Sequence, residues 1–265
     1  INYIEGRVTS YFVPKSEDFQ EIHFDMASNL QINSIYYHDQ RIDPQMYSIN
    51  DDNLKIQLPN VLFFPELDSI TIEYEGVPNS SGFGSFEIRT HDGTPVMWTL
   101  SEPYGAKVWW PCKQDLNDKI DSIDILVKTP SQYKVGSNGV LVNASNEGTQ
   151  TIYHWKHRYP IPAYLISLAI TNYAEFSDYV YLDNGDSIQI LNYVFPEDLW
   201  YAEDDLKDIL DIMYVFNELF GTYPFADEKY GHAQFGWGGG MEHQTMSSMG
   251  NFNFSLQAHE LAHQW

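Results

Sequence analysis

The chain has 265 residues, 43% of them hydrophobic, so it can bury a substantial core as one large domain or two domains of ordinary size. Its 37 acidic and 14 basic residues give a formal net charge of −23, which argues against nucleic acid or an anionic membrane surface as a partner. The single cysteine, Cys112, excludes an internal disulfide.

The first part of the chain, up to about residue 190, has the pattern of a β domain. Short runs rich in Ile, Val, Tyr, Phe and Thr alternate with turn-forming clusters, as in residues 69–76, 123–130, 133–145 and 151–157. Strict alternation in SITIEYEG and TIYHWKH predicts half-buried strands, and SNG within residues 133–145 predicts a hairpin turn. We therefore predict a mostly β saddle or sandwich domain over residues 1–194.

A helix is predicted next, over residues 202–221, because its apolar residues recur on one helical face. These residues are Leu206, Ile209, Leu210, Met213, Phe216 and Phe220. Acidic residues 203–205 suit the start of a helix, and Gly221 suits the position after its end. The pattern then predicts a strand over residues 229–236, a tight glycine connection, an extended segment over 241–249 and a helix over 255–265. We expect residues 195–265 to be the incomplete start of an α+β domain.

The last helix carries the motif HELAH, residues 259–263. His259 and His263 lie one helical turn apart on the same face, so both imidazoles can reach one metal ion. HExxH is typical of zinc peptidases, in which the glutamate, here Glu260, takes a proton from the water that attacks a carbonyl carbon. The alternative is an ordinary helix with packed or solvated histidines. A catalytic zinc needs a third protein ligand, and the chain ends two residues after His263.

A second motif, GGGMEH, precedes HELAH. In this order the two motifs resemble the zinc aminopeptidases of the aminopeptidase N and leukotriene hydrolase type, a gluzincin family in which GxMEN precedes HExxH. Gly239, Gly240, Met241 and Glu242 match the family motif, and His243 stands where the family has Asn. An imidazole does not reproduce both hydrogen-bonding groups of an amide, so the substitution bears on how Glu242 is oriented.

A third segment, residues 98–119, resembles the family's stretch in which a glutamate precedes a PC-x-D sequence. By this match Glu102 is the second amine-binding glutamate. The family's aspartate position holds Gln114, with Asp115 one place later.

The resemblance implies a β saddle, a thermolysin-like catalytic domain and a helical domain. It also implies a third zinc ligand, a Glu, and a Tyr that stabilises the oxyanion, both beyond residue 265. The implied function is a zinc metallo-aminopeptidase that removes N-terminal amino acids from peptides with a free amine. We expect the chain to be the N-terminal portion of such an enzyme and to have little or no activity alone.

Roles for the matching residues follow from this resemblance. Glu242 and Glu102 would hold the α-amine of the peptide through charge-assisted hydrogen bonds. Gly239 and Gly240 would let an extended substrate approach as an added strand, or they form only a tight turn. Met241 would line the first side-chain pocket or fill the core.

Two alternatives stay open at this point. One is an HExxH endopeptidase without amine specificity, and the other is a noncatalytic binding or scaffold module with a vestigial zinc site.

We interpret Cys112 as a buried structural thiol, and we expect His154 and His157 to face opposite sides of a strand. The sequence contains no run of about 18 apolar residues, so no membrane-spanning segment is predicted. Its acidity and its lack of disulfides favour an exported bacterial protein, in the periplasm or at the cell surface. The oligomeric state stays open.

Overall fold

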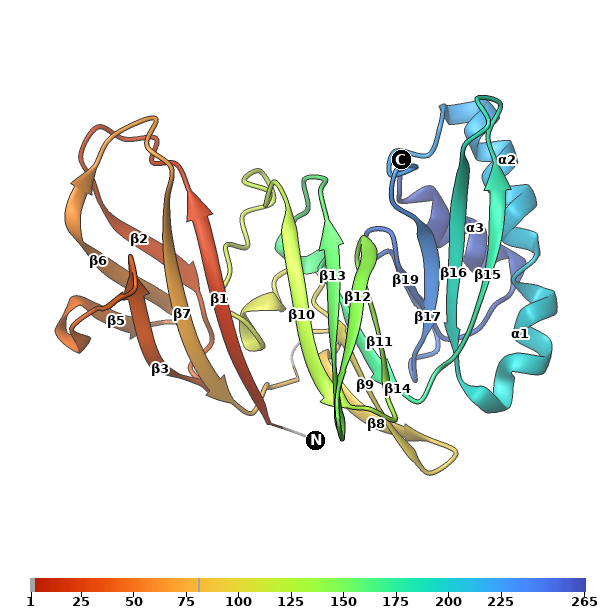
Figure 1. Cartoon of the computed structure of the whole chain (residues 1–265), viewed down its shortest axis with the longest axis horizontal. Helices are drawn as coiled ribbons and strands as arrows, with labels where there is room; N and C mark the ends of the chain where they lie inside the picture. The colour runs from red at the N-terminus through yellow and green to blue at the C-terminus, as the bar shows by residue number, and fades with distance from the viewer. Residues whose placement is uncertain (1–2, 81) are drawn as a thin grey trace. The chain divides into compact units, whose positions relative to one another are not determined.

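The computed structural model describes residues 3–80 and 82–265, and its regular structure in this range is mostly β (Figure 1). The chain forms two compact units. Unit 1 is Ile1–Phe86 with Ser101–Asp118, and unit 2 is Glu87–Leu100 with Lys119–Trp265. The predicted domain boundary between residues 194 and 195 stays a prediction.

Unit 1 contains two antiparallel sheets, with strand orders β1-β7-β3-β4 and β2-β6-β5. Alternating buried and half-buried residues along β7 confirm the strand predicted over residues 69–76. Ile35, Leu54, Ile56 and Ile72 are fully buried, so inward-facing aliphatic side chains stabilise this unit. The elements are β1 (Ile4–Phe12), β2 (Phe19–Asp25), β3 (Leu30–Tyr37), β4 (Gln40–Arg41), η1 (Pro44–Met46), β5 (Tyr47–Asn50), β6 (Asn53–Leu62), β7 (Asp68–Gly76) and η2 (Ala106–Val108).

Two further antiparallel sheets have the orders β10-β13-β12 and β11-β14-β9-β8. The strands predicted over residues 123–130 and 151–157 are confirmed as β10 and β13. The elements are β8 (Ser85–His91), β9 (Thr94–Leu100), β10 (Ile123–Pro130), β11 (Lys134–Ser137), β12 (Val140–Glu147), β13 (Gln150–His157), η3 (Ala163–Leu165) and β14 (Leu168–Thr171).

The hairpin predicted within residues 133–145 is wrong. β11 pairs with β14 and β12 pairs with β13, so the SNG turn carries the chain from one sheet to another. Gly139 has a φ of 74°, and a Cβ at this position would overlap the carbonyl of Lys156. The turn signal was therefore real, but long-range pairing chose the partner strands.

The last part of unit 2 is a five-stranded mixed sheet of order β15-β16-β17-β19-β18, covered on one face by helices (Figure 1). Ile190 of β16 packs with Met213 and Leu261 on the helical side, whereas Tyr193 and Ala233 belong to a cluster on the other side around Trp155. The elements are β15 (Ala174–Tyr181), β16 (Ser187–Val194), η4 (Pro196–Asp198), α1 (Leu199–Asp205), α2 (Asp208–Phe220), β17 (Tyr230–Gln234), β18 (Gly240–Met241), β19 (Ser247–Met249) and α3 (Phe254–Ala262).

Three predicted elements of this region differ in detail. The helix predicted over residues 202–221 is two helices, α1 and α2, and Leu206 at the break packs in a different cluster from Ile209. The segment predicted as extended contains a turn between β18 and β19. The last helix, α3, ends before the predicted position. No helix among the described residues is long and apolar enough to cross a membrane.

Candidate active site

The HELAH motif lies at the end of α3. The Asn253 side chain caps the start of the helix by accepting a hydrogen bond from the Leu256 amide at 3.0 Å. His259 lies in the last turn, and His263 follows the helix with a φ of −64° and a ψ of −14°, which continue its direction. Both histidines are exposed. The sequence therefore folds locally so that two imidazoles leave the same helix face.

The two imidazoles converge on one point. Nε2 of His259 and Nε2 of His263 are 3.2 Å apart, and the ring planes are inclined by 78°. Two nitrogens bound tetrahedrally to one zinc at about 2.0–2.1 Å would be about 3.3 Å apart. A hydrogen bond between a neutral donor and a neutral acceptor imidazole also has this length. The pair fits two adjacent positions of a tetrahedral zinc.

Glu260, which directly follows His259 in sequence, is buried, with 3% of its surface exposed. Strand β18 lies directly against it, because a Cβ on Gly240 would lie only 2.6 Å from the carboxyl carbon of Glu260. Glycine is therefore the residue that allows the strand and the carboxylate to approach this closely. The structure thus brings the GGGMEH and HELAH motifs together.

Strand β18 is the last strand of its sheet. It pairs antiparallel with β19, and Gly250 N–H donates to the Gly239 carbonyl at 2.8 Å. Within residues 3–80 and 82–265, no strand pairs with its other edge. Met241 is buried in the cluster that contains Trp98 and Phe235, which supports the core-filling role for this residue, and its pocket-lining role stays a prediction.

Glu242 follows β18 and is half-buried. Its carbonyl accepts a hydrogen bond from Nε2 of Gln264 at 3.3 Å, and Gln264 is the residue after His263. The main chain of Glu242 is therefore tied to the end of the histidine-bearing helix. Glu102 lies in unit 1, so its role rests on the resemblance alone.

His243 is fully buried and points away from solvent. Its Nδ1 lies 2.9 Å from Oγ of Ser248, and burial lowers the pKa of the imidazole to about 3. The ring is therefore neutral at physiological pH. In this chain the position that differs from the family motif holds a buried structural group.

Sequence reasoning missed Gln264, Thr245 and Lys229, which are all buried near Glu242. The side chain of each forms a hydrogen bond with a backbone group 16 or more residues away, and no spacing pattern marks such contacts. Only the position of Gln264, directly after HELAH, was a signal.

The other candidates of the sequence have structural partners. Cys112 is buried, and burial raises the pKa of its thiol well above the usual range, which supports a structural role. His154 lies 2.6 Å from Asp124, whereas His157 lies 2.5 Å from Glu228. In the part of the chain that the structure describes, no group of three or more His, Cys, Asp or Glu residues could hold a metal ion. The two histidines of HELAH could therefore provide two ligands for a zinc ion, but not a complete coordination shell.

Comparisons with known proteins agree with the motifs. Residues 2–165 match the family described as "Peptidase M1 N-terminal domain". Leucine aminopeptidase 2 of Candida glabrata is 25% identical over 190 residues, and leucine aminopeptidase 2 of Chaetomium globosum is 28% identical over 182 residues. These alignments cover 67% and 64% of this chain but 27% and 28% of the two enzymes, so the match spans about a quarter of their length.

A solved structure shares the fold over the whole chain. An M1 zinc metallopeptidase mutant from Deinococcus radiodurans, crystallised with the substrate Tyr-Ser-Ala, superposes with a TM-score of 0.82 at 19% identity. The superposition covers 100% of this chain and 60% of that protein. The prediction of a mostly β N-terminal domain is therefore confirmed. Because the family match spans more than half of the chain, the chain belongs to the M1 peptidase family and carries its N-terminal domain.

Proposed function

We propose that a longer protein carrying this chain is a zinc metallo-aminopeptidase, which removes N-terminal amino acids from peptides. In this proposal residues 1–194 form the β saddle domain, and residues 195–265 form the start of a thermolysin-like catalytic domain. One observation supports it most. The paired Nε2 atoms of His259 and His263, 3.2 Å apart, accompany a buried Glu260 against which the strand of GGGMEH is packed.

Substrate binding would use the free edge of β18. The main-chain groups of Gly239 and Gly240 can hydrogen-bond an extended peptide as an added strand, since glycine leaves the backbone accessible. Glu242, held at the end of β18, would accept hydrogen bonds from the α-amine, with Glu102 as the second acceptor. A peptide without a charged amine would leave these carboxylates unpaired, which penalises its binding. The Deinococcus radiodurans relative with the bound substrate Tyr-Ser-Ala supports peptides as the substrate class.

His259 and His263 would hold the zinc. When bound, zinc supplies Lewis acidity, which polarises the scissile carbonyl and lowers the pKa of water to about 7. Glu260 would accept a proton from the attacking water and donate it to the nitrogen of the leaving amine. Burial of Glu260 excludes bulk water from this carboxylate.

The chain alone would have little or no activity. The resemblance implies that a third ligand, a Glu, and an oxyanion-stabilising Tyr would come after residue 265, and two histidines alone bind zinc weakly. The oxyanion would then lack its donor, which typically costs about 10²–10³ in kcat.

The test is a comparison of two substrates with the longer protein. We expect rapid hydrolysis of a peptide with a free N-terminal amine and slow hydrolysis of its N-acetylated version. Equal rates would identify an HExxH endopeptidase without amine specificity. Hydrolysis of neither peptide by a zinc-loaded protein would favour the noncatalytic scaffold.

A further inference from the structure

Thr245 has an unusual backbone conformation close to Glu242, the residue proposed to bind the peptide amine and here called the amine anchor. Its φ is 65°, in the left-handed region that β-branched residues rarely adopt, and it is fully buried. Such a conformation persists only where surrounding contacts determine it, and it tends to mark functional sites. The contacts of Thr245 therefore show what holds the loop between β18 and β19.

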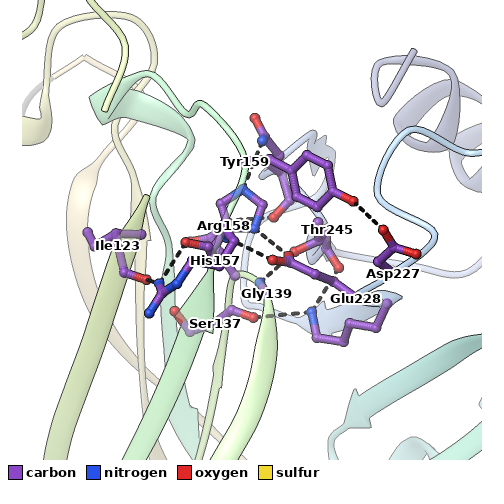
Figure 2. A network of polar contacts seen from close by, with 12 residues as sticks. Ile123, Ser137, Gly139, His157, Arg158, Tyr159, Asp227, Glu228 and Thr245 are labelled. Carbon is purple, nitrogen blue, oxygen red and sulfur yellow. Dashed lines mark hydrogen bonds and ion pairs between the residues drawn. The ribbon is translucent and has the colours of Figure 1, made fainter. Parts of the chain in front are cut away.

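Three hydrogen bonds fix Thr245, and together they use all its polar groups. Its hydroxyl Oγ1 accepts from Gly139 N–H at 2.7 Å, and its carbonyl accepts from Nζ of Lys229 at 2.9 Å. Its own N–H donates to Oε1 of Gln264 at 2.8 Å. The partners thus come from the β11–β12 turn, from the start of β17 and from the end of α3. Figure 2 shows Thr245 and Gly139 in this network, with Ser137 as a further part of it.

Lys229 is the central donor. It is 1% exposed, its Nζ also donates to the Ser137 carbonyl at 3.3 Å, and it lies 5.3 Å from the centre of the Trp155 ring. Burying an amine is costly unless its hydrogens find acceptors, and here two carbonyls and an aromatic face satisfy it. The adjacent Glu228 accepts from Arg158 N–H at 2.8 Å and lies 2.5 Å from His157 (Figure 2). These contacts offset the free-energy cost of burying the Lys229 amine, and its bond to Thr245 holds the loop between β18 and β19.

Gln264 connects this loop to both halves of the candidate site. Its side chain accepts from Thr245 N–H through Oε1 and donates to the Glu242 carbonyl through Nε2. It directly follows His263 in sequence. One amide therefore links the main chain of the amine anchor to the end of the histidine-bearing helix.

We propose that Lys229, Thr245 and Gln264 form a positioning clamp, which holds Glu242 at a fixed spacing from the histidine pair so that a peptide amine and the scissile bond are bound together. This inference rests on the proposed function. The three residues act through Glu242 and need not touch substrate. Their loss should therefore weaken amine recognition more than it weakens zinc binding.

Hydrogen exchange of the longer protein tests the clamp without relying on activity. In the wild type, the Thr245 amide should exchange as slowly as the amides of β13, because its bond to Gln264 is buried. Lys229→Met keeps the apolar stem and removes the amine, and it should speed exchange over residues 242–246 by about tenfold or more. Lys207→Met, at an exposed lysine paired with Asp204, is the control and should change nothing there.

Kinetics give the second readout. Lys229→Met should raise KM for a free-amine peptide by about tenfold at unchanged zinc content, with a smaller fall in kcat. If this variant does not fold, Gln264→Met should give the same pattern. A wild-type Thr245 amide that exchanges like an open loop, or faster exchange spread evenly over unit 2, would overturn the clamp. If the exchange results hold but the wild type cleaves free and acetylated peptides equally, the clamp stands and the aminopeptidase proposal fails.

Discussion

The histidine pair and the segment with Glu242, the two halves of the candidate site, are held in place in different ways. The pair is local and exposed, because two residues four apart on one short helix bring their Nε2 atoms within 3.2 Å. The loop that carries Glu242 after β18 is held by long-range contacts, such as those of Asn138 with Gln244 and of Gly139 with Thr245, each spanning 106 residues. In the proposed enzyme, metal binding would therefore depend on helix geometry, whereas amine recognition would depend on the packing of unit 2. Substitutions should therefore separate the two.

Replacing the proposed base gives the largest expected effect on rate. Glu260→Gln in the longer protein should lower kcat by about 10²–10⁴, because general base catalysis is lost, while one zinc stays bound. The measurement is steady-state kinetics together with zinc content. Retained activity, or loss of zinc together with activity, would contradict the role of Glu260.

Replacing Glu242 should weaken recognition of the peptide amine. Glu242→Gln keeps the size of the side chain and removes its charge, so we expect kcat/KM for a free-amine peptide to fall by about 10–100-fold. The rate for the N-acetylated peptide should change little. The ratio of the two rates is the readout, and an unchanged ratio would remove Glu242 from amine binding.

Gly240→Ala tests the contact between strand β18 and the Glu260 carboxylate. The added methyl group would overlap the Glu260 carboxylate, so we expect a loss of about 1–3 kcal/mol in the free energy of unfolding and a lower kcat. Gly238→Ala is the matched control, because a Cβ there meets nothing within 4 Å. Thermal unfolding and kinetics of both variants check this prediction. Equal effects of the two substitutions would show that β18 is not packed against Glu260.

The smallest effect is a pH dependence of stability. Burial lowers the pKa of His243 and of His232 to about 3, whereas an unfolded histidine titrates near pH 6.5. The unfolded state therefore binds more protons as pH falls below about 6.5, and the free energy of unfolding decreases until about pH 3. His243→Asn should reduce the loss of stability between pH 7 and pH 5 by about 2 kcal/mol, measured by urea unfolding. An equal loss of stability in the wild type and in His243→Asn would contradict this role of the buried ring.

Local features of this chain could be predicted from sequence. Strict alternation located β7 and β13, and the spacing in HELAH located the histidine pair. In each case the signal lies within one element, where periodicity and side-chain direction are coupled. The same logic predicted a helix over residues 202–221, but not the break near Leu206, where the chain packs into two separate hydrophobic clusters.

Long-range features could not be predicted. The SNG turn looks like a hairpin, yet β11 and β12 join different sheets, since the register of each is set by distant strands. Lys229 resembles any surface lysine in sequence, and only the fold shows that it is buried against Trp155 and two carbonyls. The clamp therefore became visible only once the contacts across unit 2 were known.

Zinc content of the longer protein is the most direct test of the central claim that the helix pair holds a catalytic metal. We predict one zinc per chain in the wild type, and loss of most of it in both His259→Gln and His263→Gln, with the fold retained by circular dichroism. A wild type that binds no zinc, or two histidine variants that each keep a full equivalent, would contradict the account.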